Sequence, residues 1–473
     1  MLSQLNETEE RAFLHFLASP YFNRQERLLH LAEYLCQHPA DTWQHEQLHQ
    51  QLYRSAEPYR KQAVYDALSQ LQRLLERFLS LQSFEANPHL QQSMLLQSLA
   101  KIQAEDAFQR QWQKAQKKWQ DYAFQDLSYF EGQYDLHRQA SLFEATQQRR
   151  TQDDYLHKTV EYLDRSYWSA RLKYACEILN RSHILKKSPE EEAIKPNIIA
   201  YLPPHLAAER SIKAYLLIYK ALSELQNTEH YHTWINWLSE HSQYFGPEEA
   251  ADMYNYAQNY CVRKVNQGDA SYLRNLFDLF TQLTEKELLL DKNGFIDHRK
   301  LKNMVTVGLR LQAFDWVDRF LHDHQEKMLP SYREDAFRFN LASLRYAQGR
   351  HSEALRLLQQ VDFKDVFYLL SAKSLLLKIY FETDEDMALE FQLENFRLFL
   401  ARNRLVSSFQ RNVHLNLLRF TRKLYRLREQ KGMISKDAFA ERLLKLETQL
   451  RAAADVANAS WLYSQIKILQ AGD

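Results

Sequence analysis

Apolar residues recur along most of the chain at the spacing of an α-helix. One short segment carries them at positions i, i+3, i+4 and i+7, which share one helix face: Leu28, Leu31, Ala32 and Leu35. A longer segment, whose first turn we expect near Pro58, carries them at near-heptad spacing: Val64, Leu68, Leu71, Leu75 and Phe78. Segments of this kind predict amphipathic helices that bury one side and expose the other.

The sequence also marks the ends of the first helices. Asn6 and Glu9 have the spacing of a capping box, in which each side chain binds the other residue's backbone N–H, and Asn23 and Glu26 repeat it. Pro20 cannot continue a helix, so we expect the first helix to end just before it.

Glycine and proline are rare in this chain. The 473 residues include 8 Gly and 10 Pro, whereas average usage predicts about 57 of the two together. Strands, hairpins and long loops depend on both residue types, and helix interiors exclude them. A glycine-rich phosphate-binding loop is also missing from the sequence. The composition therefore predicts an all-α fold and disfavours a nucleotide-binding α/β fold.

We expect four parts along the chain. A compact helical N-terminal unit fills residues 1–87, and long helices fill residues 88–187. An irregular connection covers residues 188–205, where four of the 10 prolines lie beside a run of three glutamates. Helical repeats fill residues 206–473.

The C-terminal half carries a weak internal repeat. A turn residue is followed by packing residues five and nine positions later in three copies: Gly268, Leu273 and Phe277; Gln312, Val317 and Leu321; Gly349, Ala354 and Leu358. A fourth copy begins with Thr383 and Ala388, but Gln392 occupies its third position. The turn residues lie 44, 37 and 34 residues apart. Periods of this length predict an α-solenoid of stacked antiparallel helix pairs.

Two resemblances support this architecture. The segment 341–358 resembles a tetratricopeptide repeat, although Arg345 and His351 stand where that repeat has aromatic residues. The whole chain is similar to an uncharacterised family of bacterial all-helical repeat proteins, on these stretches: 19–23, 259–268, 302–305, 308–309, 314–316, 365–368 and 372–380. The resemblance implies a tetratricopeptide-like helical-repeat fold and implies no activity.

One motif has the spacing of a zinc site. His45 and His49 enclose a glutamate in an HExxH pattern, which on a helix places both imidazoles on one face. In one class of zinc protease a glycine and a third histidine follow, but Leu52 and Ser55 stand at those positions. We therefore expect a solvated helix face, and a zinc hydrolase at His45 and His49 is the remote alternative.

A second pattern resembles the middle of a calcium-binding EF-hand loop, from Asp291 to Asp297. That loop needs an acid two residues earlier and a glutamate three residues later, where this chain has Leu289 and Lys300. A turn between helices is the better interpretation.

The three cysteines, Cys36, Cys176 and Cys261, are expected to be small buried residues. We thus predict no catalytic, cofactor-binding or metal-binding residues.

Charge is unevenly distributed, although the net charge is only +1. Residues 397–431 carry ten cations and a single acid, Glu429, and an acidic block precedes them between Glu382 and Glu394. The candidate partner-binding residues are those of a basic stripe: Arg402, Arg404, Arg411, Arg419, Arg422, Lys423, Arg426 and Arg428. Either the acidic block neutralises this stripe from within the chain, or the stripe is open to a partner.

These features predict a non-enzymatic protein-interaction or scaffold protein that binds a peptide or protein segment, possibly an acidic one, on a helical-repeat surface. The alternative is a nucleic-acid binder that uses the basic stretch 397–431, which the near-zero net charge disfavours. The most apolar run, residues 214–222, is nine residues long and contains a lysine, so we expect no membrane span. We expect a cytoplasmic protein.

Overall fold

The computed structural model describes residues 1–38, 42–53, 58–147, 154–181, 198–361, 365–453 and 455–471. Over these residues the chain forms 21 α-helices with short 3-10 turns and no strand. A single isolated bridge joins Ile296 and Met328. The all-α prediction is therefore confirmed. Most of the expected connection at 188–205 lies outside the described residues, which resume with a 3-10 turn at Ile198–Tyr201.

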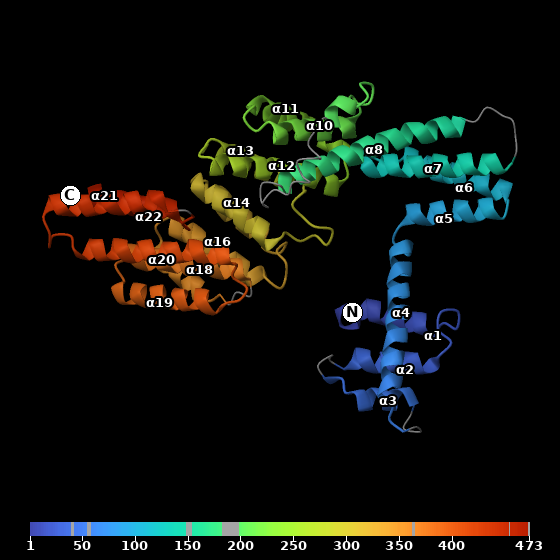
Figure 1. The fold of residues 1–473 in the computed structure, drawn as a ribbon, viewed down its shortest axis with the longest axis horizontal. Coiled ribbons are helices and arrows are strands. Elements are labelled where there is room, and N and C mark those ends of the chain that lie inside the picture. The colour runs from blue at the N-terminus through green and yellow to red at the C-terminus, as the bar shows by residue number, and fades with distance from the viewer. Residues whose placement is uncertain are drawn as a thin grey trace. The chain divides into compact units, whose positions relative to one another are not determined.

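The chain divides into two compact units, Met1–Phe245 (unit 1) and Gly246–Asp473 (unit 2), which we describe separately. Figure 1 labels most of their helices. Unit 1 contains α1 (Glu7–Ala18), α2 (Glu26–Gln37), α3 (His45–Tyr53), α4 (Lys61–Glu85), α5 (Pro88–Lys101), α6 (Glu105–Gln120), α7 (Leu127–Thr146), α8 (Asp154–Arg181), α10 (Arg210–Ser223) and α11 (Thr228–His241).

Unit 2 contains the remaining helices, which are α12 (Pro247–Asn266), α13 (Tyr272–Glu285), α14 (His298–Arg310), α15 (Phe314–Asp323), α16 (Arg333–Ala347), α17 (His351–Leu358), α18 (Val366–Glu382), α19 (Asp386–Arg402), α20 (Ser408–Glu429), α21 (Lys436–Ala452) and α22 (Ala459–Ala471). Within the described residues, no helix combines the length and the apolar character needed to cross a membrane.

The first helix begins and ends as the sequence predicts. Asn6 accepts hydrogen bonds from the backbone N–H groups of Thr8 and Glu9, and the Glu9 carboxylate accepts one from the Asn6 N–H at 2.9 Å. The helix ends at Ala18, two residues before Pro20. Local chemistry alone is enough to place both ends.

One expectation about the next helices is wrong. Asn23 does not cap α2, because the N-cap is Gln25 and its side chain makes no capping bond. The Asn23 amide instead donates to the carbonyl oxygens of Leu17 and Gln25, both at 3.0 Å, and so fixes the turn between α1 and α2. Helix α4 begins at Lys61 with Arg60 as its N-cap, so its first turn lies near Pro58 as expected.

Two hydrophobic clusters hold the helices from α1 to α7 of unit 1 together. The first joins α1 to α4 within the expected N-terminal unit, and Phe13, fully buried, lies 5.3 Å from Phe78 in it. The second joins α5, α6 and α7, where the rings of Phe108 and Phe143 stack at 4.0 Å. Helix α8 packs on α7 and α10, and Cys176 donates to the Tyr215 carbonyl oxygen across the α8–α10 contact.

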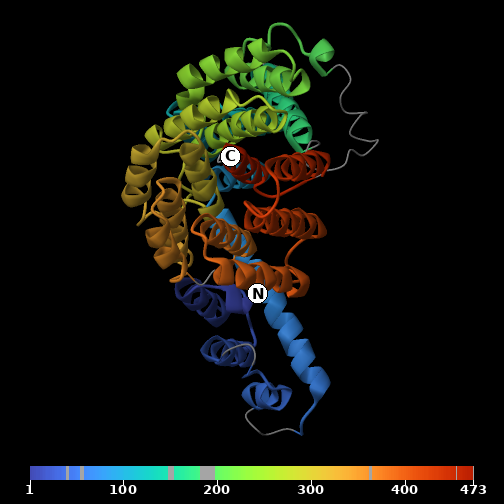
Figure 2. The ribbon, with the colours of Figure 1, turned by 90° about the vertical axis from the view of Figure 1, so that its left-hand side faces the viewer.

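Each helix of unit 2 packs against the next one along the chain. Helix α14 also contacts α16, α16 contacts α18, and α20 contacts α22. In Figure 2 these successive helices follow a curved path within the unit, from yellow at α13 to red at α22. The apolar faces of neighbouring helices thus bury one another, as in the cluster that joins α18 to α22.

The turns inside four helix pairs share a left-handed residue. These residues are Gly268, Gln312 and Gly349, with φ of 101°, 58° and 76°, and Asp384, with φ of 58°. The fourth copy in the sequence was therefore misaligned by one position, since its turn lies at Asp384 and not at Thr383. Counting five and nine residues from Asp384 gives Leu389 and Leu393, both of which are buried.

Glu382 links four helices of unit 2 through a polar cluster. Its Oε1 atom accepts hydrogen bonds from Tyr346 (2.7 Å), Trp461 (2.6 Å) and Gln465 (3.1 Å). His351 lies 3.4 Å from the other oxygen. These bonds connect α16, α17 and α22 to the end of α18, so a half-buried carboxylate organises the contact between them.

Gly308 marks a close approach between α14 and α15. A Cβ atom at this position would lie 2.6 Å from the Cγ2 atom of Val317, which is fully buried. Real Cβ atoms do not approach other atoms this closely, so the absence of a side chain permits the contact.

We expect Gly308→Ala to reduce the free energy of unfolding by about 1–2 kcal/mol, because overpacking outweighs the better helix propensity of alanine. Chemical denaturation measures the change. In a Val317→Ala background the clashing methyl group is absent, and there Gly308→Ala should be neutral or stabilising. The same loss in both backgrounds would show that this contact does not require the glycine.

Candidate functional site

Helix α20 presents four of the eight residues of the basic stripe to solvent. Arg419, Arg422 and Arg426 are exposed, and the buried residues of the helix, among them Leu417 and Leu424, lie on its other side. Ser407 caps the helix with a capping box. The sequence spacing predicts this separation of charged and apolar faces.

The other candidates of the stripe lie in different surroundings. Arg402 is the last residue of α19, Arg404 lies in the turn after it, and both are exposed. Arg411 is half-buried and donates to the Asn403 carbonyl oxygen at 3.4 Å. The structure therefore does not bring all eight residues to one surface.

Arg428 is engaged inside unit 2. It pairs with Asp384 and with Asp386, the latter at 3.0 Å, and its guanidinium lies 4.5 Å from the ring centroid of Phe381. The acidic block thus neutralises the end of the stripe. Arg397 likewise pairs with Glu394 at 2.6 Å. The other exposed cations of α20, which include Arg422 and Arg426, are considered next.

A groove between α20 and α21 collects four cations from the two helices. Lys423 and Arg426 come from α20, and Arg442 and Lys445 come from α21. The groove has a volume of about 230 Å³, and the rest of its lining is Leu427, Gln430, Leu446 and Gln449. We call these eight residues the cationic groove. None of the described residues that line it is acidic.

Two glutamines hold two of these cations in place. Gln449 accepts a hydrogen bond from Lys423 at 2.6 Å, and Gln430 accepts one from Arg442 at 2.5 Å. Neutral amides orient the cations without cancelling their charge. The positive potential in the groove is therefore available to an anion, and solvent screening limits its range to about 10 Å at moderate salt.

The charge pattern along the chain did not predict the α21 half of the groove. Arg442 and Lys445 lie beyond the stretch that ends at residue 431, so the charge count along the chain did not include them. They are three residues apart in a helix, a spacing that places two side chains on one face. That spacing is the signal that could have identified them.

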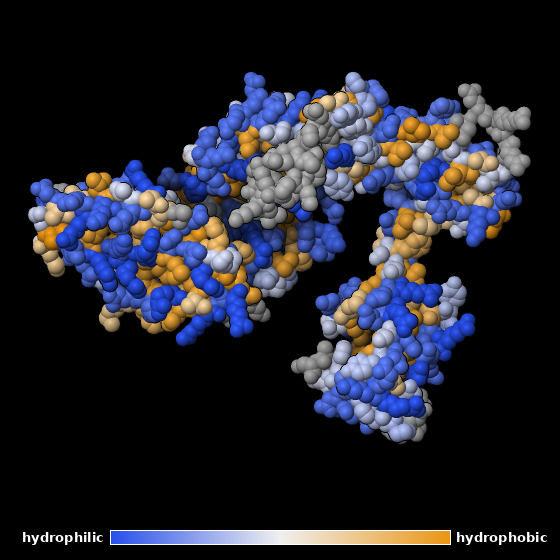
Figure 3. Space-filling view, viewed as in Figure 1, coloured by the Kyte–Doolittle hydropathy of each residue, from blue (hydrophilic) through white to orange (hydrophobic). Residues whose placement is uncertain are grey.

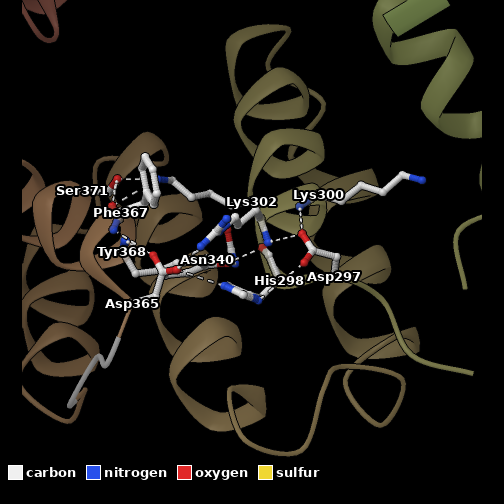
Figure 4. Close-up of polar contacts among 10 residues, drawn as sticks. Asp297, His298, Lys300, Lys302, Asn340, Asp365, Phe367, Tyr368 and Ser371 are labelled. Atoms are coloured by element: carbon white, nitrogen blue, oxygen red, sulfur yellow. Dashed lines mark hydrogen bonds and ion pairs between the residues drawn. The ribbon is translucent and has the colours of Figure 1, made fainter. Parts of the chain in front are cut away.

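A second polar site lies at the start of α18. Asp365 caps this helix by accepting hydrogen bonds from the N–H groups of Phe367 (2.8 Å) and Tyr368 (3.2 Å). It also faces α14, where His298 lies at 3.3 Å and Arg299 at 3.0 Å (Figure 4). Burial alone would raise the pKa of Asp365, but these hydrogen bonds outweigh it and lower the pKa.

Tyr368 adds a second bond between α14 and α18. Its hydroxyl donates to the His298 carbonyl oxygen at 2.6 Å and receives a bond from the Asn340 amide of α16 at 3.4 Å. Three helices that are far apart in sequence thus meet at one buried phenol. The arrangement positions the start of α18 and is structural in character.

Lys302 points from α14 toward α18 in the same view. Its ammonium group contacts the Ser371 hydroxyl and lies 5.4 Å from the ring centroid of Tyr368 (Figure 4). Burial lowers the pKa of Lys302 to about 8, although the charge of Asp365 opposes the shift. Ser371 donates its own proton to the Phe367 carbonyl oxygen at 2.8 Å, as serines inside helices do.

The expectation of a solvated face at the HExxH motif is wrong for His49. This residue is 3% exposed, and its ring lies 4.8 Å from that of Tyr53, because its side of α3 faces the N-terminal core. His45 lies 5.1 Å from the ring of Tyr65. Across the described residues, no three His, Cys, Asp or Glu side chains come close enough together to hold a metal ion.

The loop from Asp291 to Asp297 connects two helices. Asp291 accepts hydrogen bonds from the N–H groups of Asn293 and Phe295, both at 2.8 Å, and Asp297 caps α14. Its geometry is that of a turn between helices, as the sequence predicts.

The buried Cys176 has a raised pKa because burial disfavours its thiolate.

Comparison of the chain with protein-family models, with curated proteins and with solved structures gives no match in any of the three. The resemblance to helical-repeat proteins therefore stays a prediction.

We expect Lys302→Met to flatten the pH dependence of stability above neutral pH. An unfolded lysine has a pKa of about 10.4, so between pH 8 and pH 10 the unfolded chain binds more protons and stability rises with pH. One such lysine contributes at most about 2 kcal/mol to this rise.

Denaturation of both proteins at pH 7, 8, 9 and 10 measures the effect. Lys292→Met, at an exposed position of unit 2, is the control and should retain the wild-type pH dependence. An unchanged slope in Lys302→Met would mean that the buried amine is not charged to different extents in the folded and unfolded chains.

Proposed function

We propose that this chain is a non-enzymatic interaction protein, and that unit 2 is an α-solenoid of stacked antiparallel helix pairs that binds an acidic protein segment in the cationic groove. The observation that carries the proposal is the convergence of Lys423, Arg426, Arg442 and Lys445 on one groove whose described lining contains no acid. Like charges this close repel, and an anionic partner removes that cost.

The groove has the composition of a peptide-binding surface. Leu427 and Leu446 are its apolar lining, and the cations and the two glutamines supply charge and hydrogen bonds. Acidic motifs in proteins bind to clusters of basic residues by charge-assisted hydrogen bonds. An extended segment with alternating acidic and apolar side chains satisfies both kinds of contact.

A nucleic-acid partner fits the groove less well. Proteins that hold single strands stack the bases on aromatic side chains, in addition to contacting the phosphates. None of the described residues that line the cationic groove is aromatic. The net charge of +1 adds no long-range attraction for a polyanion.

The proposed compartment is the cytoplasm. No disulfide joins the cysteines of the described residues, and Cys176 and Cys261 are buried. Unpaired thiols are usual in a reducing compartment.

The proposal predicts that Arg426→Glu with Lys445→Glu, one change on each side of the groove, weakens binding of an acidic peptide at least tenfold. Two lost charge-assisted contacts of about 1.5 kcal/mol each account for this. Fluorescence anisotropy with a labelled peptide of alternating Asp, Glu and Leu residues measures it, with an Asn/Gln analogue as the neutral peptide.

Arg310→Glu with Lys292→Glu is the matched control, because both residues are exposed cations of unit 2 outside the groove. The control should retain wild-type affinity, and both variants should keep the wild-type circular dichroism. Equal binding by the groove variant and wild type would refute the site. Tighter binding of a single-stranded oligonucleotide than of the peptide would favour the nucleic-acid alternative.

A further inference from the structure

Helix α8 of unit 1 has two apolar faces. One face packs on α7 and α10 and contains the buried residues Ser166, Ser169, Leu172, Ala175, Cys176 and Leu179. The other face is exposed and carries Leu156, Val160, Leu163, Tyr167 and Tyr174, with Ala170 half-buried between the tyrosines. We call these six residues the α8 seam. In Figure 3, apolar residues coloured orange gather over the part of unit 1 where α7 and α8 lie.

The α8 seam has the spacing of a coiled coil. Its positions are separated by 4, 3, 4, 3 and 4 residues, the a and d pattern that two supercoiled helices bury between them. At about 100° per residue the seam lies opposite the buried face, so the packing inside unit 1 does not account for it. Surface helices normally carry polar residues on that side.

The α8 seam has a defined C-terminal end. The next heptad positions after Tyr174 are Glu177 and Arg181, both charged. Six consecutive apolar positions therefore form one ordered row along α8. A scattered set of exposed apolar residues has no such order.

We propose that the α8 seam pairs with the α8 seam of a second copy of this chain as an antiparallel two-helix coiled coil. A two-fold axis beside Arg165 pairs Leu163 with Tyr167 of the other copy. It also pairs Val160 with Ala170 and Leu156 with Tyr174. Every apolar position of the α8 seam then meets another apolar position, so the seam is complementary to itself.

Side-chain size favours the antiparallel pairing. In a parallel pair in register, Tyr167 faces Tyr167 of the second copy and Ala170 faces Ala170. The tyrosine layer is then crowded and the alanine layer leaves a gap. The antiparallel pair matches each tyrosine with a leucine and the alanine with a β-branched valine. Interfaces in which large and small side chains alternate fill space more evenly.

The area available sets the strength of the contact. The five exposed side chains of the seam are 43–62% accessible, which corresponds to about 1,000 Å² over both copies for residues of this size. Stable interfaces bury roughly 1,200–2,000 Å² in total, so the dimer is a weak and reversible one. Asp164 flanks the seam next to the axis, where it faces Asp164 of the second copy. The repulsion between these two carboxylates weakens the dimer further.

Sedimentation equilibrium of the full-length protein tests the pairing. We expect a monomer–dimer equilibrium that becomes dimeric within about 1–100 μM, and Leu163→Glu should leave only monomer up to the highest concentration. Ile102→Glu is the control, since Ile102 is a 71% exposed apolar residue of unit 1 outside the seam. It should dimerise like wild type. All three proteins should melt at similar temperatures, because both side chains are exposed.

Two further variants test the register. Asp164→Asn removes a like-charge pair at the axis and should tighten the dimer several-fold. A Leu163→Cys/Tyr167→Cys double variant should form an intermolecular disulfide under mild oxidation, because position 163 of one copy faces position 167 of the other. Leu163→Cys alone should not, because position 163 lies away from position 163 of the second copy.

Three results would overturn the proposal. The first is a wild-type protein that stays monomeric throughout the concentration range. The second is a dimer that Leu163→Glu leaves intact, which would place the interface elsewhere. The third is efficient cross-linking of Leu163→Cys alone, which would indicate a parallel pair and reject the antiparallel one.

Discussion

Most of unit 2 depends on one constraint: a short helix pair cannot bury its own apolar faces, and the next pair along the chain must cover them. The chain satisfies this constraint with left-handed turn residues that reverse it within a few positions, at Gly268, Gln312, Gly349 and Asp384. Gly308 then lets α14 approach α15 to the distance at which Val317 fills the gap. Each pair presents its remaining face to its neighbour.

The same arrangement explains where polar chemistry accumulates. Helix ends leave N–H and C=O groups unpaired, and in unit 2 several of them lie close to other helices. Asp365 satisfies the start of α18 and simultaneously pairs with Arg299, while Glu382 near the end of α18 gathers donors from three other helices. These carboxylates join neighbouring helices, whereas Lys423 of α20 bonds to a neutral amide, that of Gln449.

Sequence reasoning recovered what local chemistry determines and missed what the fold brings together. The cap at Asn6, the end of α1 and the two faces of α20 follow from residues within one or two turns, and all were predicted. The role of Asn23 was missed because its partners depend on the path of the following turn. The fourth turn was misplaced by one residue because aspartate, unlike glycine, gives little sign of a left-handed conformation. His49 is buried by neighbours that its motif does not reveal. The groove was half predicted, because its second wall comes from another helix.

The bonds between α14 and α18 also affect how unit 2 unfolds. In a simple stack each pair touches only its neighbours, so the ends can fray one pair at a time. Here Arg299 and His298 reach Asp365 and Tyr368 across an intervening pair, more than 60 residues away in sequence. Opening α16 and α17 therefore also loosens the bonds that span them. We expect such contacts to make the helices from α14 to α18 open together, so that their amides exchange as one block.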